Sequence, residues 1–180
     1  MSTYTLHLGG VTRELPIIAV SDEVSIASFV ILGDTEIVQT AAPLLADKLP
    51  PVDMLVTAEA KGIPFVYELS KQLGMKRYIV ARKSVKPYMK NPIVDKASSI
   101  TTQKEQQLVL EERDAALLEG KRIALVDDVI STGESLLALE KLVTRAGGNV
   151  MTKAAILAEG NAAAMEDITF LETLPLFKKE

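Results

Sequence analysis

Apolar and polar residues alternate in two short runs near the start of the chain. Residues 4–8 and 11–15 each place every second side chain on one face, which is typical of strands with one buried face. Gly9 and Gly10 lie between the runs, and glycine adopts the positive φ angles of a tight turn without steric cost. The pattern therefore predicts an N-terminal hairpin within residues 1–20.

Farther along, mostly apolar runs alternate with segments of helical periodicity. The apolar runs predict buried strands at residues 26–32, 54–57, 77–81, 122–126 and 150–157. Apolar residues spaced three and four apart predict helices after Asp34, at residues 65–73 and at about residues 135–146. Asp34 can cap the first of these helices, and Gly74 stands where glycine commonly ends a helix.

This alternation predicts an α/β fold with a central, mostly parallel sheet flanked by helices. We expect a single domain over residues 1–180, because the length suits one core and no linker or repeat is visible. In such sheets, ligands bind beyond the carboxyl ends of the strands. The residues that follow Thr57, Ala81 and Val126 are therefore the first candidates for chemistry.

A basic, weakly periodic stretch separates the two halves of the predicted sheet. Residues 82–96 contain several basic side chains and two prolines, which predicts a loop. After it, residues 98–102 and 106–110 are predicted to pair as a hairpin.

Composition excludes several classes of function. The chain has no cysteine and one histidine, His7, so a thiolate nucleophile is excluded and a Ser-His-Asp triad is disfavoured. Aromatic residues make up 4% of the chain and the net charge is −4, which argues against a nucleic-acid partner. The start of the chain lacks a signal-peptide pattern, and no apolar run is long enough to span a membrane. We therefore expect a cytoplasmic protein without a membrane partner.

Two adjacent carboxylates follow the apolar run 122–126. Asp127 and Asp128 repel each other, and burial at a strand end makes their charges costly. A cation, or a ligand with several hydroxyl donors, would offset this cost.

Small and hydroxyl-bearing residues come next and open the helix at 135–146. Backbone N–H groups at a helix start bind anions, and hydroxyl side chains add donors. These residues are Ser131, Thr132, Gly133, Glu134 and Ser135. A pair of carboxylates that can accept hydrogen bonds from two neighbouring hydroxyls, beside a turn that can bind phosphate, matches ribose 5-phosphate. The alternative interpretation is an acidic N-cap with a serine- and threonine-rich first turn that only stabilises the helix.

The whole array resembles the signature of type I phosphoribosyltransferases, which bind 5-phosphoribosyl 1-pyrophosphate (PRPP), and is most similar to the adenine and xanthine enzymes. The resemblance implies a Rossmann-like core with a small hood at residues 1–20 and a flexible flap at residues 83–110. It implies that Asp127 and Asp128 hold the ribose hydroxyls and that residues 131–135 hold the 5-phosphate. It also implies a nucleobase substrate, Mg²⁺ bound mainly through PRPP and water with no residue assigned as a direct ligand, and a homodimer.

Two further segments extend the resemblance to the pyrophosphate. Residues 59–62 are similar to the E-A-R-G loop of the adenine enzymes, with lysine in place of arginine. Residues 82–83 resemble an arginine–lysine segment that follows a core strand in the same enzymes. The implied pyrophosphate ligands are Glu59, Ala60, Lys61, Gly62, Arg82, Lys83 and Lys86. An ordinary capped turn and a solvated basic loop are the alternative interpretations.

The base side of the site departs from the adenine pattern. By resemblance, Glu159 and Phe177 lie near the base. Residues 99–105 lack an acid at the position where the adenine enzymes carry a flap glutamate, although Glu105 lies close by. We therefore predict transfer of the phosphoribosyl group to a purine, with adenine as the leading acceptor. Xanthine, another base, and a PRPP-binding regulator without turnover are the alternatives.

Overall fold

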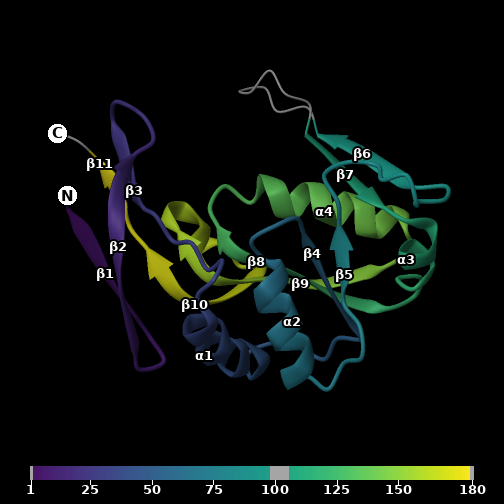
Figure 1. Ribbon diagram of the computed structural model, residues 1–180, viewed down its shortest axis with the longest axis horizontal. Helices are drawn as coiled ribbons and strands as arrows, with labels where there is room; N and C mark the ends of the chain where they lie inside the picture. The colour runs from purple at the N-terminus through teal and green to yellow at the C-terminus, as the bar shows by residue number, and fades with distance from the viewer. Residues whose placement is uncertain (1, 98–105, 179–180) are drawn as a thin grey trace.

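The computed structural model describes residues 2–97 and 106–178 and is built around a five-stranded sheet (Figure 1). The order across the sheet is β10-β9-β8-β4-β5, and every neighbouring pair is parallel, as predicted. The strands are β4 (Met54–Ala58), β5 (Ile79–Ala81), β8 (Arg122–Ile130), β9 (Asn149–Glu159) and β10 (Ile168–Leu174). Of these, the pattern of the sequence missed β10.

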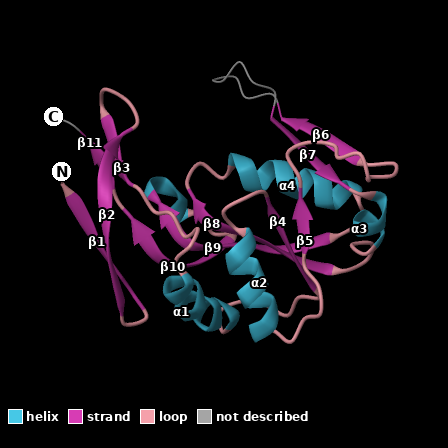
Figure 2. Ribbon diagram, in the orientation of Figure 1, coloured by secondary structure: helices cyan, strands magenta, loops and turns pink. Residues whose placement is uncertain are grey.

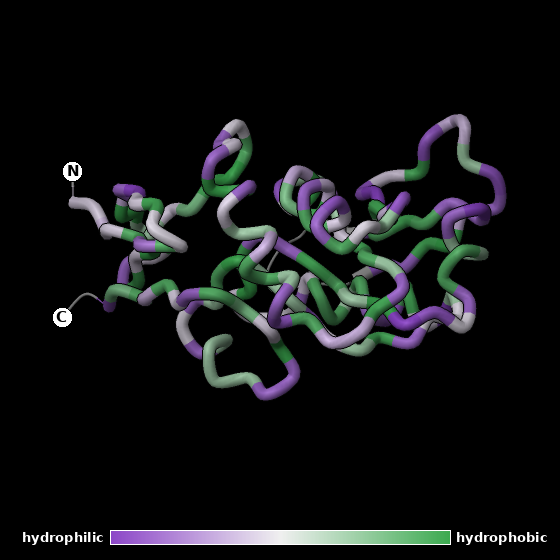
Figure 3. Tube along the Cα trace, turned by 90° about the horizontal axis from the view of Figure 1, so that it is seen from below, coloured by the Kyte–Doolittle hydropathy of each residue, from purple (hydrophilic) through white to green (hydrophobic). Residues whose placement is uncertain are grey.

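Helices cover both faces of this sheet (Figure 2). The helices α1 (Thr35–Ala46) and α2 (Ile63–Gln72) pack on one face, where Leu55 and Ala124 are buried. On the other face lie α4 (Glu134–Arg145) and the short α3 (Glu112–Ala116), against Val56 and Leu125. Consecutive strand residues therefore point into different cores, which explains why these strands are apolar throughout. In Figure 3, hydrophobic stretches run through the interior strands and hydrophilic stretches gather at the turns.

The predicted N-terminal hairpin is confirmed and belongs to a second, antiparallel sheet at one end of the molecule (Figure 1). Its strand order is β1-β2-β3-β11, with β1 (Thr3–Leu8), β2 (Val11–Ala19), β3 (Val24–Ala27) and β11 (Leu176–Lys178). Gly9 and Gly10 both have positive φ, as the turn requires. We call this four-stranded sheet the hood.

The largest differences from the predicted bounds concern two strands. The strand predicted at 26–32 ends at Ala27, and beyond it Phe29 and Ile31 are buried while Val30 and Leu32 are exposed. The strand predicted at 122–126 continues to Ile130, because β9 supplies hydrogen-bond partners along its whole length. Asp127 and Asp128 therefore lie within β8, not after it.

A separate two-stranded hairpin stands beside α4 (Figure 2). It pairs β6 (Ile93–Ala97) with β7 (Gln106–Leu110), so the last part of the loop predicted at 82–96 is a strand. Residues 98–102, the predicted partner of 106–110, lie outside the described residues. The backbone of Arg82 pairs with Val109, which ties β7 to the end of β5. No helix in the described part of the chain is long and apolar enough to cross a membrane.

Candidate active site

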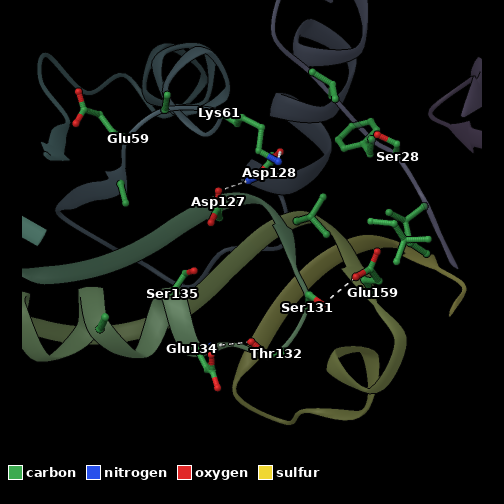
Figure 4. A pocket seen from close by; sticks show the side chains of 18 of the residues that line it. Ser28, Glu59, Lys61, Asp127, Asp128, Ser131, Thr132, Glu134, Ser135 and Glu159 are labelled. Carbon is green, nitrogen blue, oxygen red and sulfur yellow. Dashed lines mark hydrogen bonds and ion pairs between the residues drawn. The ribbon is translucent and has the colours of Figure 1, made fainter. Parts of the chain in front are cut away.

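A cavity of about 970 Å³ opens at the carboxyl ends of β4, β8 and β9, where the central sheet meets the hood (Figure 4). One wall carries the polar groups of the turns after β4 and β8. The opposite wall is formed by residues 26–30 together with Leu174 and Glu159. The position agrees with the rule that parallel sheets bind ligands beyond the carboxyl ends of their strands.

The two adjacent carboxylates lie on the floor of this cavity. The backbone N–H of Asp128 donates a 2.8 Å hydrogen bond to Oδ1 of Asp127. Burial, reinforced by Asp128, raises the pKa of Asp127 to about 7. The neighbouring Asp128 is 3% exposed, and its Oδ2 lies 3.1 Å from Nζ of Lys61. That ion pair lacks hydrogen-bond geometry, so Oδ2 has no hydrogen-bond partner within the described structure.

Close packing holds the turn after β4 against this floor. A Cβ added to Gly62 would collide with Oγ1 of Thr57 and lie 3.5 Å from Cα of Asp127. Only glycine therefore fits at this position, which lets the turn approach β8. The turn includes the cis peptide bond between Glu59 and Ala60.

The turn from Ser131 to Gly133 leads directly into α4. Gly133 has a φ of 81° and occupies the N-cap, where no side chain makes a capping hydrogen bond. The backbone N–H of Glu134, the first residue of α4, donates a 3.4 Å hydrogen bond to Oγ1 of Thr132, so one hydroxyl of the turn serves the helix start, as the alternative interpretation expects. Ser131, Thr132, Glu134 and Ser135 all line the cavity beside the N-terminus of α4.

An ion-pair network joins the turn after β4 to the loop after β5. The Glu59 carboxylate accepts hydrogen bonds from Nε of Arg82 at 2.6 Å and from the backbone N–H of Lys83 at 2.7 Å. These contacts, the Lys83 N–H first, lower the pKa of Glu59. Arg82 also donates to the Tyr88 hydroxyl at 2.8 Å.

The structure brings most of the predicted pyrophosphate ligands together, but not all of them. Glu59, Ala60, Lys61 and Lys83 line the cavity. The cavity is not lined by the other three, Arg82, Lys86 and Gly62. Nζ of Lys86 instead donates a 2.7 Å hydrogen bond to Oγ of Ser84. As arranged here, Arg82 holds the Glu59 turn instead of facing the cavity.

Glu159 and Ser131 meet at the hood side of the cavity (Figure 4). The Ser131 hydroxyl donates a 2.8 Å hydrogen bond to Oε1 of Glu159, which is 8% exposed. The parallel register explains the contact, because Ile130 pairs with Ala158 and each residue is followed by one of the two.

The second residue predicted near the base, Phe177, lies elsewhere. Its ring packs edge-on against Tyr4, with 6.2 Å between ring centroids, and it does not line the cavity. In this structure Phe177 is a packing residue of the hood. Sequence reasoning missed residues 26–30 as a cavity wall, because their apolar pattern indicated only a buried strand. Residues 99–105, compared above with the flap glutamate segment, lie outside the described residues.

Comparison with known proteins identifies a family. The family model described as "Phosphoribosyl transferase domain" matches residues 37–175. A relative from Thermosipho melanesiensis, named adenine phosphoribosyltransferase, is 30% identical over 152 residues, covering 83% of this chain and 78% of its own length. A xanthine phosphoribosyltransferase from Chloroflexus aurantiacus is 31% identical, covering 69% of this chain and 58% of its own.

Solved structures agree with these matches. The crystal structure of an adenine phosphoribosyltransferase from Thermoanaerobacter pseudethanolicus superposes with a TM-score of 0.66 at 25% identity, covering 79% of this chain and 84% of that one. One from Rhodothermus marinus gives the same TM-score at 18% identity, covering 96% and 94%. At that lower identity the likeness concerns the fold alone, and it extends over nearly the whole chain.

Proposed function

We propose that this chain, which belongs to the phosphoribosyltransferase domain family of glycosyltransferase-type enzymes, catalyses the PRPP-dependent transfer of the 5-phosphoribosyl group to a purine base. The leading acceptor is adenine, which places the reaction in purine salvage. The observation that supports the proposal is one cavity in which two adjacent buried carboxylates lie beside the N-terminus of α4. The relatives named adenine phosphoribosyltransferase support the choice of base.

In this proposal, Asp127 and Asp128 accept hydrogen bonds from the ribose hydroxyls. Oδ2 of Asp128, which is buried and lacks a hydrogen-bond partner in the described structure, would accept one of these hydrogen bonds. The turn at residues 131–135, Gly133 included, binds the 5-phosphate through backbone N–H groups and hydroxyls at the start of α4. Negative charge beneath the ribose also favours the positive charge that develops on the ring as the bond to pyrophosphate breaks.

We assign the pyrophosphate to the turn after β4 and the loop after β5. Lys61 and Lys83 line this side of the cavity and offer positive charge. Glu59 and Arg82 fix the two segments relative to each other through their 2.6 Å contact. Gly62 lets the turn after β4 approach the cavity closely. Lys86 lies on the loop after β5, and it must leave its hydrogen bond with Ser84 before it can bind the pyrophosphate.

We propose Mg²⁺ as the cofactor, carried mainly by the pyrophosphate and by water. The described residues include no group of three or more His, Cys, Asp or Glu side chains that could hold a metal ion. When bound, the ion neutralises charge on the leaving pyrophosphate. The side chains of Lys61 and Lys83 orient the same group.

The apolar wall of residues 26–30 and Leu174 gives a flat purine ring a surface to pack on. We further propose that the protein is a cytoplasmic homodimer. Sedimentation at micromolar concentration tests the dimer directly.

The decisive experiment supplies PRPP, Mg²⁺ and one base at a time, and follows the release of pyrophosphate. We expect release with adenine and a loss of orders of magnitude in the double variant Asp127→Asn, Asp128→Asn. The double variant Asp22→Asn, Glu23→Gln is the control, because it removes two charges from an exposed turn. PRPP binding without release for any base would favour a regulator, and failure to bind PRPP would refute the proposal altogether.

A further inference from the structure

A hydrogen-bonded pair of side chains stands where the base would meet the ribose. The Ser131 hydroxyl lies on the turn that also carries Thr132 and Ser135, and it donates to the Glu159 carboxylate at 2.8 Å. In Figure 4 Ser131 and Glu159 lie next to each other, and Glu134 and Ser135 lie apart from them on the first turn of α4. If the 5-phosphate binds at the start of α4 and the base packs on the apolar wall to which Glu159 belongs, C1 of the ribose faces Ser131 and Glu159.

The proposed reaction needs a proton acceptor at this place. A purine enters with a proton on its imidazole ring, and the nucleotide product no longer carries it. The proton must leave as the bond between C1 and nitrogen forms, because otherwise positive charge accumulates on the base. A positioned acceptor typically accelerates such a step by about 10²–10⁴-fold.

The other carboxylates that line the cavity are engaged elsewhere or lie too far along it. Glu59 is held by Arg82 and the Lys83 N–H. The Asp127–Asp128 pair lies on the floor, next to Lys61. Glu134 begins α4 at the phosphate end.

Glu159 differs from all of these. It is 8% exposed, it lines the cavity together with the apolar residues 26–30 and Leu174, and among residues 2–97 and 106–178 only Ser131 hydrogen-bonds to its carboxylate. Its second oxygen, Oε2, accepts no hydrogen bond from these residues.

We propose that Ser131 and Glu159 relay the imidazole proton of the base during transfer. The Ser131 oxygen accepts the proton while its own hydroxyl proton passes to Oε1 of Glu159. The base nitrogen then bonds to C1, and the electron pair of the broken C1–O bond leaves with pyrophosphate. The resulting carboxylic acid returns its proton to water through the open side of the cavity. Ser131 is the catalytic residue, and Glu159 acts through it as a positioning residue and final acceptor.

This inference rests on the proposed function, and Glu159→Gln tests it. Glutamine keeps the volume and can still accept the Ser131 hydrogen bond, but it cannot take up a proton. Glu172→Gln is the matched control, because it removes the same charge from an exposed position on β10, the strand beside β9. Three measurements apply to each protein: PRPP affinity by calorimetry, kcat and KM with adenine, and the dependence of kcat on pH.

We expect Glu159→Gln to lower kcat for adenine by about 10²–10⁴-fold while PRPP affinity stays within about threefold. Its residual rate should rise with pH as more of the base ionises in solution, whereas the control follows the wild type. The loss in kcat should be smaller with 8-azaadenine, because its more acidic ring N–H loses its proton more readily without a proton acceptor. Ser131→Ala, which breaks the relay at its first step, should show the same pH dependence.

Two outcomes overturn the relay alone. One is a parallel loss of PRPP affinity and kcat, because Glu159 would then merely support the turn. The other is a loss in kcat that is the same for both bases and at every pH. If instead the wild-type protein releases no pyrophosphate with any base, the proposed function fails and the relay fails with it.

Discussion

Replacing Asp127 by asparagine should stabilise the protein, and increasingly so as the pH rises. Burial and the neighbouring Asp128 move the pKa of Asp127 from 3.8 to about 7. A raised carboxyl pKa means that the folded state binds the proton more tightly than the unfolded state does. The resulting stabilisation is complete below the unfolded pKa near 3.8 and is lost as the pH rises through about 7.

The size of the effect follows from the displacement of the pKa. A shift of one unit corresponds to about 1.4 kcal/mol, so a shift of roughly three units corresponds to about 4 kcal/mol above pH 7. Asparagine does not titrate, so the variant does not lose this stabilisation as the pH rises. About 1 kcal/mol of this is already lost at pH 4.5, so the difference in unfolding free energy between variant and wild type should grow by about 3 kcal/mol between about pH 4.5 and about pH 8.

Urea denaturation at several pH values measures this difference. Asp22→Asn serves as the control, because Asp22 is exposed in the turn before β3 and should give a difference that barely changes with pH. A constant difference for Asp127→Asn across the range would refute the reasoning. It would mean that the buried pair carries no net electrostatic cost in the folded state.

The same substitution should weaken PRPP binding. A hydrogen bond to a charged acceptor contributes about 1.5–3 kcal/mol, so its loss corresponds to roughly a 10- to 150-fold increase in Kd. Calorimetric titration with PRPP at about pH 8 measures it. A variant that is more stable and binds more weakly would show that Asp127 serves the ligand at the expense of the fold.

Three other substitutions have defined expectations. Lys61→Ala removes the charge that faces the buried Asp128 and should cost about 1–2 kcal/mol in urea denaturation at pH 8, whereas Lys61→Arg should cost less; equal losses would contradict the ion pair. Phe177→Ala should lower the unfolding free energy by about 1–3 kcal/mol and leave KM for the base unchanged, and a raised KM would restore Phe177 to the base site. Glu59→Gln releases Arg82 and the Lys83 N–H and should raise KM for PRPP by about threefold to tenfold, with the melting temperature as the control for folding.

The fold was largely predictable because its strongest signals are local. The alternation of apolar runs with helical segments gave the parallel sheet, and Gly9 and Gly10 gave the hairpin turn. The bounds of β8 were not predictable in the same way. Two acidic residues ordinarily end a strand, yet here β9 hydrogen-bonds to β8 as far as Ile130. The pairing partner lies more than twenty residues away, and a local pattern does not contain it.

The candidate site likewise has parts that the local sequence predicted and parts that depend on distant strand pairing. Asp127 and Asp128, the turn at 131–135 and the turn after β4 are contiguous segments, so their residue types alone predicted an anion- and diol-binding cavity. The hood wall depends on the pairing of β11 with β3, which joins Leu176 to Ile26 across 150 residues of sequence. Phe177 was assigned to the base by resemblance, and the local pattern of the sequence does not contain the pairing that packs it within the hood.

The extension of β8 also explains why the base side holds an unexpected pair. If β8 ended at Val126, the acids would lie in a loop, and Ser131 would have no fixed relation to β9. Because the strand continues to Ile130, its register with Ala158 carries Ser131 and Glu159 to adjacent strand ends. The same hydrogen bonds hold Asp127 and Asp128 inside the sheet, where desolvation raises the pKa of Asp127. One feature of the backbone thus places the proposed ribose acceptors and the proposed proton relay at a fixed separation, which a reaction at C1 between them would require.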